Sequence, residues 1–189
     1  AGGGFVTAQN ADYMEMERVA LAYMREHALT FTQRTASEAN GSGFKAIDCT
    51  FNSFGVPGGP GWEWAVKMPD SDGDFSGNRK FIGMECGGMP GFNLANANNT
   101  VIERSSFAGF TMMGNCRTTR LMGCRFGSWG GSPSLDIRGR NHQFMGNQIA
   151  SSLTIKSDCF GSFFLMGALG GNHGGVVRQD PPGNGNLVL

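Results

Sequence analysis

The chain has 189 residues, enough for one domain with a sizeable core, and 31 of them are glycine, roughly twice the ordinary usage. Its 15 Lys and Arg balance its 15 Asp and Glu, so it lacks the positive charge typical of nucleic-acid-binding proteins. No apolar run approaches the ~20 residues of a membrane span, and the five cysteines lack zinc-type spacing. We therefore expect no cofactor, no nucleic-acid partner and no membrane insertion.

The first part of the chain predicts an arm followed by a helix. Residues 1–10 are rich in glycine and are expected to form a flexible N-terminal arm. In 11–42 we expect a capping helix over 11–28 and a first strand after it. Asp12 and Glu15 fit a capping box, and apolar residues recur from Met16 at helical spacing.

Short similar segments repeat through the rest of the chain. Asp48-Cys49-Thr50-Phe51 has counterparts that end at Phe107, Phe126 and Ile149. A second set, such as Phe92-Asn93-Leu94, places apolar residues two apart, which is typical of strands with one buried face. Self-similarity at about 20 residues predicts a solenoid. We expect its coils over 43–177, and an extended C-terminal tail over 178–189.

The repeated motif, seen as Ile47-Asp48-Cys49-Thr50-Phe51, resembles that of the right-handed parallel β-helix proteins. These pectin-lyase-like solenoids include pectate lyases and phage tailspikes. The resemblance implies an all-β fold, a short right-handed parallel β-helix of about six coils with an N-terminal capping α-helix. Stacked coils would align Phe51, Phe107, Phe126 and Ile149 in one interior ladder, and Cys49, Ser105, Cys124 and Asn147 in a second ladder at a bend.

One group of charges in outward strand positions is a candidate catalytic site. Asp136, Arg138 and Lys156 cluster there, and an arginine base beside a carboxylate is what proton abstraction from a uronic acid needs. The alternative is a solvated strand face with ion pairs between neighbouring strands. The sequence favours this second interpretation.

Candidate metal ligands and reactive thiols are sparse. Asp70, Asp72 and Asp74 alternate in a Gly-containing loop, which suits Ca²⁺, but the glutamate of an EF-hand is missing and a solvated loop is the alternative. The histidines His27, His142 and His173 are scattered. Cys49 and Cys86 could lie on adjacent coils, although buried inert thiols are the default.

Methionines mark a candidate interface. Met122, Met145 and Met166 each lie beside a repeated segment and could stack in one column. An outward column would be an exposed apolar stripe and a subunit interface, whereas an inward column would be part of the core. Both interpretations stay open at this point.

These features favour a non-catalytic structural or interaction protein. The tailspike-like resemblance implies a viral (phage) particle component such as a spike, fibre or decoration protein, located in the virion and assembled in the host cytoplasm. Its expected partners are further copies of the chain and other virion proteins, with a surface glycan as a further candidate ligand. The alternative is a polysaccharide lyase, hydrolase or epimerase that acts on an outer face through Asp136, Arg138 and Lys156.

Overall fold

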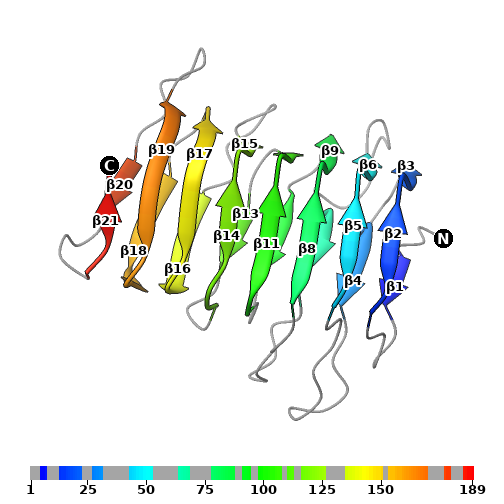
Figure 1. The fold of residues 1–189 in the computed structure, drawn as a ribbon, viewed down its shortest axis with the longest axis horizontal. Helices are drawn as coiled ribbons and strands as arrows, with labels where there is room; N and C mark the ends of the chain where they lie inside the picture. Colours follow the sequence, from blue (N-terminus) through cyan, green and yellow to red (C-terminus); the bar gives the residue numbers. More distant parts are fainter. Residues whose placement is uncertain are drawn as a thin grey trace, which may run out of the picture.

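The protein is a parallel β-solenoid, whose strands stack side by side along the long axis of the molecule in two layers (Figure 1). The described strand pairs are all parallel. The computed structural model describes residues 5–7, 13–22, 27–31, 43–52, 64–68, 78–87, 91–94, 98–107, 110–112, 116–126, 135–150, 153–169, 177–179 and 185–189. Within these ranges there is no helix.

The first sheet has eight strands, one from each coil. In spatial order they are β1 (Phe5–Thr7), β4 (Leu29–Phe31), β7 (Val66–Lys67), β10 (Phe92–Leu94), β13 (Phe110–Met112), β16 (Leu135–Arg140), β18 (Leu153–Phe160) and β20 (Val177–Gln179).

The second sheet lies in the other layer and consists of two strips joined at a bend. The first strip contains β2 (Glu15–Glu17), β5 (Lys45–Ile47), β8 (Arg79–Ile82), β11 (Thr100–Glu103) and β14 (Arg120–Met122). The second strip contains β3 (Ala20–Ala22), β6 (Thr50–Asn52), β9 (Glu85–Gly87), β12 (Ser106–Phe107) and β15 (Arg125–Phe126). The long strand β17 (Gln143–Ile149) pairs with both β14 and β15, and β19 (Phe163–Leu169) and β21 (Leu187–Val188) follow it.

In each coil, the segment that forms the strands of the second sheet follows a nine-residue pattern of inward and outward side chains. In the coil that begins at Gly43 the inward side chains, all fully buried, are Phe44, Ala46, Cys49 and Phe51. The intervals between them are two, three and two residues, because a residue with positive φ is inserted at the bend. That bend residue recurs as Arg18, Asp48, Gly83, Arg104, Gly123 and Gly146. Left-handed φ is unfavourable for most residues, so its recurrence shows that the bend is imposed by the stacking of the coils.

The predicted capping helix is wrong for the part of 11–28 that the structure describes. Residues 13–22 form β2, a bend at Arg18 and β3. The three-residue interval from Met16 to Val19 spans this bend, and the same interval is typical of a helix. Glu15 caps no helix there, and its carboxylate instead pairs with Lys45 Nζ at 3.2 Å on the next strand.

The strands that the structure describes form eight coils, not about six. The predicted N-terminal arm contains β1, which pairs with β4. The region expected to hold the helix supplies two strands of the first coil, β2 and β3. At the other end β20 pairs with β18, and β21 pairs with β19. The sequence-based interpretation missed these coils because their repeated segments lack the phenylalanine that marks the central ones.

Aromatic rings connect the central coils. The Phe81 ring lies 5.7 Å from that of Phe44 and 5.2 Å from that of Phe92, measured between centroids. Phe92 continues to Phe107 at 5.1 Å. The predicted interior ladder is present in Phe51, Phe107 and Ile149, which are all buried. These rings fill the space between the two sheets and bind successive coils to one another.

A second, polar ladder lies at the bend of the second sheet. The Asn147 side chain accepts the Cys124 N–H at 2.9 Å and donates to the Leu121 carbonyl at 3.0 Å. Ser105 Oγ likewise accepts the Met84 N–H at 3.0 Å. Each bend side chain thus pairs a buried backbone group of the preceding coil, which would otherwise be costly to bury. The predicted small-residue ladder therefore has a hydrogen-bonding role.

Candidate functional site

The structure brings together the three charged residues that the sequence singled out. Asp136 and Arg138 lie on β16, and Lys156 lies on the neighbouring strand β18. Ile137 and Ile155, directly paired between these strands, are fully buried. Because side chains alternate between the two faces of a strand, the charged residues occupy the outer face of the first sheet.

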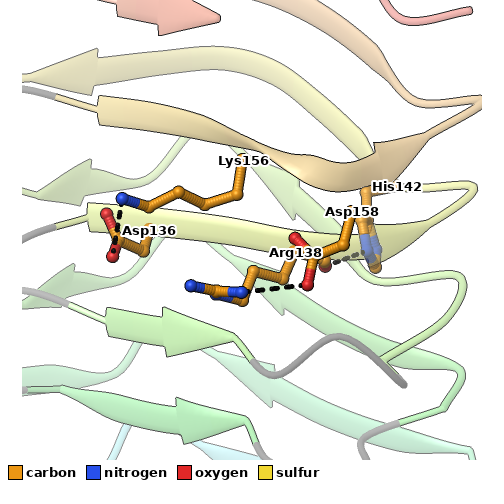
Figure 2. Close-up of polar contacts among 5 residues, drawn as sticks. All are labelled: Asp136, Arg138, His142, Lys156 and Asp158. Carbon is orange, nitrogen blue, oxygen red and sulfur yellow. Dashed lines mark hydrogen bonds and ion pairs between the residues drawn. The ribbon is translucent and has the colours of Figure 1, made fainter. Parts of the chain in front are cut away.

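A fourth residue, Asp158, completes this group and was missed by the sequence analysis. Figure 2 shows two ion pairs side by side across the two strands. Arg138 Nη1 lies 3.0 Å from Asp158 Oδ2, and Lys156 Nζ lies 3.3 Å from Asp136 Oδ2. The side chains of the first pair are 41% and 39% exposed, and those of the second pair are 31% and 23% exposed.

An irregularity in β18 explains how Asp158 reaches Arg138. The register runs from Ile137 opposite Ile155 to Gly139 opposite Cys159. Three residues of β18 therefore face one residue of β16, as in a β-bulge. Strict alternation would have assigned Lys156 alone to this position. The sequence contained one indication of this pair, because Asp158 is a second charged residue two positions after Lys156.

His142 lies behind the ion pairs, at the bend between β16 and β17, and is buried. Its Nε2 lies 2.9 Å from the Arg138 carbonyl oxygen (Figure 2). Its Nδ1 accepts the Thr119 N–H at 3.2 Å. An N–H can only donate, so Nδ1 is unprotonated and Nε2–H donates to the carbonyl. Burial lowers the pKa of His142 to about 4, although the bond to the Arg138 carbonyl opposes this effect.

This arrangement is poorly suited to acid–base catalysis. A guanidinium that donates to a carboxylate offers no lone pair for a proton from substrate. Both carboxylates of the group accept from a cation, whereas glycoside hydrolysis needs one of them as a protonated acid. Both nitrogens of His142 are engaged with backbone groups of the bend. The charges of the group are mutually compensated.

We expect the Arg138–Asp158 pair to contribute little to stability, because both side chains are about 40% exposed to solvent. A double-mutant cycle with Arg138→Met and Asp158→Asn should give a coupling energy of about 0.2–1 kcal/mol. Urea unfolding at low and high salt measures it, and the coupling should shrink as salt rises. A coupling energy that is unaffected by salt would contradict a solvated ion pair.

Two of the three methionines that were predicted to stack in one column lie on the outer face. Met122 and Met145 pair in register and are half-buried, next to the fully buried Leu121 and Phe144. Their column continues at Leu165, which is 43% exposed and stands where Met166 was expected. Met166 instead pairs with Asn147 at a register shift, and its side chain is outside the described part.

The other sites predicted from the sequence form no metal centre among the described residues. The aspartates at 70, 72 and 74 and the histidine at 173 lie outside them, and no group of metal-ligating side chains is found within them. Cys86 pairs with Phe51 and not with Cys49, and the five cysteines are buried and form no disulfide. Burial raises the pKa of the Cys86 thiol to about 12 and that of Cys124 to about 11, as expected of inert thiols. His27 Nδ1 accepts the Trp64 N–H at 3.1 Å.

Comparison with known proteins adds little to this description. No family model matches the chain, and no curated protein does. The described residues contain no helix of the length and hydrophobicity that a membrane crossing requires. Among solved structures the chain is similar to QnrB1, described as a plasmid-mediated fluoroquinolone resistance protein. The TM-score is 0.40 at 12% identity, over 80% of this chain and 70% of that one.

Proposed function

We propose that the protein is a non-catalytic structural or interaction module. The proposal rests on the two ion pairs at the candidate site, in which each cation is neutralised by a carboxylate within 3.3 Å. The buried His142 behind the group uses both of its ring nitrogens in hydrogen bonds with backbone groups. What remains for function is the outer surface of a rigid stack of coils, which can present side chains in regular columns.

The apolar column on the first strip of the second sheet supports an interaction role. Soluble monomers rarely expose long contiguous apolar stripes, and such stripes commonly mark protein interfaces. Met122, Met145 and Leu165 form part of this stripe. We propose a homo-oligomer as the working assembly.

The more specific version of this function is a viral (phage) particle component, such as a spike, fibre or decoration protein. It rests on the tailspike-like motif in the sequence, and other virion proteins and a surface glycan would be its partners. A right-handed winding belongs to the same proposal, because parallel crossover units are right-handed in about 98% of cases.

The second candidate is a polysaccharide lyase, hydrolase or epimerase. The adjacency of Asp136, Arg138 and Lys156 on one outer face favours it over other kinds of enzyme. It requires a substrate that displaces Asp158 from Arg138 and so frees the guanidinium to contact a uronate.

Two measurements test the module against the enzyme. We expect light scattering to show an oligomer at micromolar concentration, and a broad panel of uronate and neutral glycans to show no turnover. Cleavage that is lost in Arg138→Ala and kept in Arg125→Ala, a matched change on β15, would establish the enzyme and reject the module. A strict monomer would remove the homo-oligomeric assembly from the proposal.

A further inference from the structure

Two arginines lie directly beside each other on the outer surface, where the chain turns from the first sheet into the second. Arg117 and Arg140 are joined in register by a parallel β-bridge between adjacent coils. The Arg140 N–H donates to the Cys116 carbonyl and its carbonyl accepts the Thr118 N–H, both at 3.0 Å. Because Cys116 and Gly139 are buried, alternation directs the following arginines outward, with their Cα atoms ~4.8 Å apart. The backbone therefore holds two guanidinium groups, here called the arginine pair, on one face.

Within the described residues, no carboxylate compensates these two charges. Neither arginine side chain has an ion-pair or hydrogen-bond partner there. Arg138, two positions earlier on β16, is by contrast paired with Asp158 (Figure 2). The second oxygen of that carboxylate, Oδ1, accepts no hydrogen bond, so Arg140 does not share Asp158. Like charges that face each other on adjacent strands are destabilising, so the arginine pair costs stability without an internal contact in the described part.

The same corner of the solenoid contains further positive charge. The described segments 116–122 and 139–145 contain three arginines, the third being the exposed Arg120, and no aspartate or glutamate. The other like charges in register within the described strands are Lys45 and Lys80, and Lys45 is paired with a glutamate of the preceding coil. The arginine pair thus differs from the other charged neighbours of the described part, and its field favours an anion.

An exposed aromatic ring follows the arginine pair along the solenoid axis. Phe160 on β18 is directly paired with Arg140, so the three side chains form one column over three coils. Phe160 is 45% exposed, whereas the phenylalanines of the core are at most 3% exposed. Two coil spacings, about 10 Å, separate the ends of this column. It therefore offers two cations and a flat apolar surface to one ligand of that length.

We propose that this column binds a phosphorylated sugar, with the phosphate between the two guanidinium groups and the sugar ring against Phe160. The proposal rests on the module function above and gives its surface glycan a chemical class. Arginine suits this task because its planar guanidinium donates two parallel hydrogen bonds to a phosphate. A sugar ring has an apolar C–H face, and its burial against Phe160 removes apolar surface from water. The hydrogen-bonded backbone of the column positions these groups before the ligand binds.

Charge selects a phosphate monoester among the common anionic groups of sugars. A phosphate monoester carries a charge of about −1.5 to −2 at neutral pH and has three terminal oxygens. It can neutralise both members of the arginine pair and accept hydrogen bonds from each of them. A carboxylate carries one negative charge, and its two oxygens are satisfied by one bidentate guanidinium. A sulfate ester also carries one negative charge. Either group would leave one cation of the pair uncompensated.

Isothermal titration calorimetry with glucose 6-phosphate tests the arginine pair. We expect a dissociation constant of about 0.1–1 mM for the wild type at low salt. Arg117→Gln and Arg140→Gln should each weaken binding about tenfold, since each removes one charge and its hydrogen bonds. Arg125→Gln is the matched control and should bind as the wild type does, because Arg125 is exposed on β15 and its register neighbours Ser106 and Gln148 are uncharged. The thermal unfolding midpoint of each variant verifies that it is folded. Binding that is absent at about 10 mM ligand, or that all three variants weaken equally, overturns the proposal.

A comparison of ligands tests the phosphate. Glucose 6-sulfate and glucuronate should bind about tenfold more weakly than glucose 6-phosphate, since each leaves one arginine unpaired. The affinity for glucose 6-phosphate should fall about fourfold from pH 7.5 to 5.5, because the phosphate gains a proton with a pKa of about 6. Glucose 6-sulfate should show no such change. Equal affinities for the three ligands, or a phosphate affinity that is independent of pH, would reject the phosphate monoester.

Phe160→Ala tests the sugar. We expect it to reduce the affinity for glucose 6-phosphate to that for inorganic phosphate, and to leave the affinity for inorganic phosphate unchanged. A variant that binds both ligands as the wild type does would show that the ring makes no contact with the sugar, and it would overturn the proposal. Failure of all binding, with no glycan turnover, refutes this inference and leaves the module function in place. Turnover of a glycan that is lost in Arg138→Ala refutes the module function, whichever ligand the arginine pair binds.

Discussion

Replacement of Phe81 by alanine is expected to lower the free energy of unfolding by about 3–5 kcal/mol, a large share of the stability of a domain of this size. The Phe81 side chain is fully buried, and its ring contacts those of Phe44 and Phe92 and lies 6.4 Å from that of Phe31. Its removal leaves a cavity at the point where three coils meet. In a solenoid each coil contacts only its neighbours, so the loss weakens the contacts of the third coil with both neighbouring coils.

Equilibrium urea unfolding at a fixed protein concentration measures the effect of Phe81→Ala. Phe160→Ala is the matched control, because the same atoms are removed from a side chain that is 45% exposed. We expect the control to lose less than about 1 kcal/mol. Phe81→Leu should fall between the two, since it refills part of the cavity. Equal losses at positions 81 and 160 would show that the aromatic stack does not hold the coils together.

The parallel solenoid could be predicted because its signal is repeated. Phe51, Phe107 and Ile149 are alike in sequence since stacked coils place them in one environment, and the structure buries all three. Arg79 shows where the repeat is a poor guide. It holds the inward position of Phe44 one coil later, fully buried, with its guanidinium 5.4 Å from the centre of the Phe31 ring. A pattern of apolar positions cannot predict a buried cation that packs on an aromatic face.

The predicted helix fails for a reason that is general to bent strands. A left-handed residue such as Arg18 inserts one extra position at the bend, so Met16, which is buried, and Val19, which packs against the core, lie three apart. Three-residue spacing next to two-residue spacing imitates the apolar stripe of a helix. The later coils contain the same three-residue step, from Ala46 to Cys49, in a context where the repeat is visible.

The candidate site could be predicted only in part. The sequence placed Asp136, Arg138 and Lys156 on one outer face, and alternation along the strands was sufficient for that. Asp158 needed the bulge in β18, which depends on the stacking of two particular strands and leaves no periodic signal. The pairing of all four charges is what turns an apparent catalytic group into a neutral surface. The ion-pair partner of Arg138 is therefore the one residue of the group that periodicity could not place.

Acid should destabilise the fold through His142, by about 3 kcal/mol. Burial lowers its pKa in the folded chain from 6.5 to about 4, so the unfolded chain binds more protons between these values. The contribution of the neutral imidazole is complete above pH 6.5 and disappears as pH falls toward 4. The physical cause is local: a proton on Nδ1 would face the Thr119 N–H, which now donates to it, so this hydrogen bond would be lost.

His142→Asn provides a control that cannot titrate. Two coils later Asn186 occupies the same position of the repeat, where it accepts the Ser162 N–H at 3.0 Å and donates to the Cys159 carbonyl at 2.7 Å. An asparagine at 142 can therefore accept from Thr119 without a pH-dependent charge. Urea unfolding from pH 7.5 to 4 should show a slope in the wild type that exceeds the slope of the variant, since carboxylates contribute equally to both. Equal slopes would mean that the imidazole is solvated in the folded chain and that its hydrogen bond with the Thr119 N–H contributes nothing to the pH dependence.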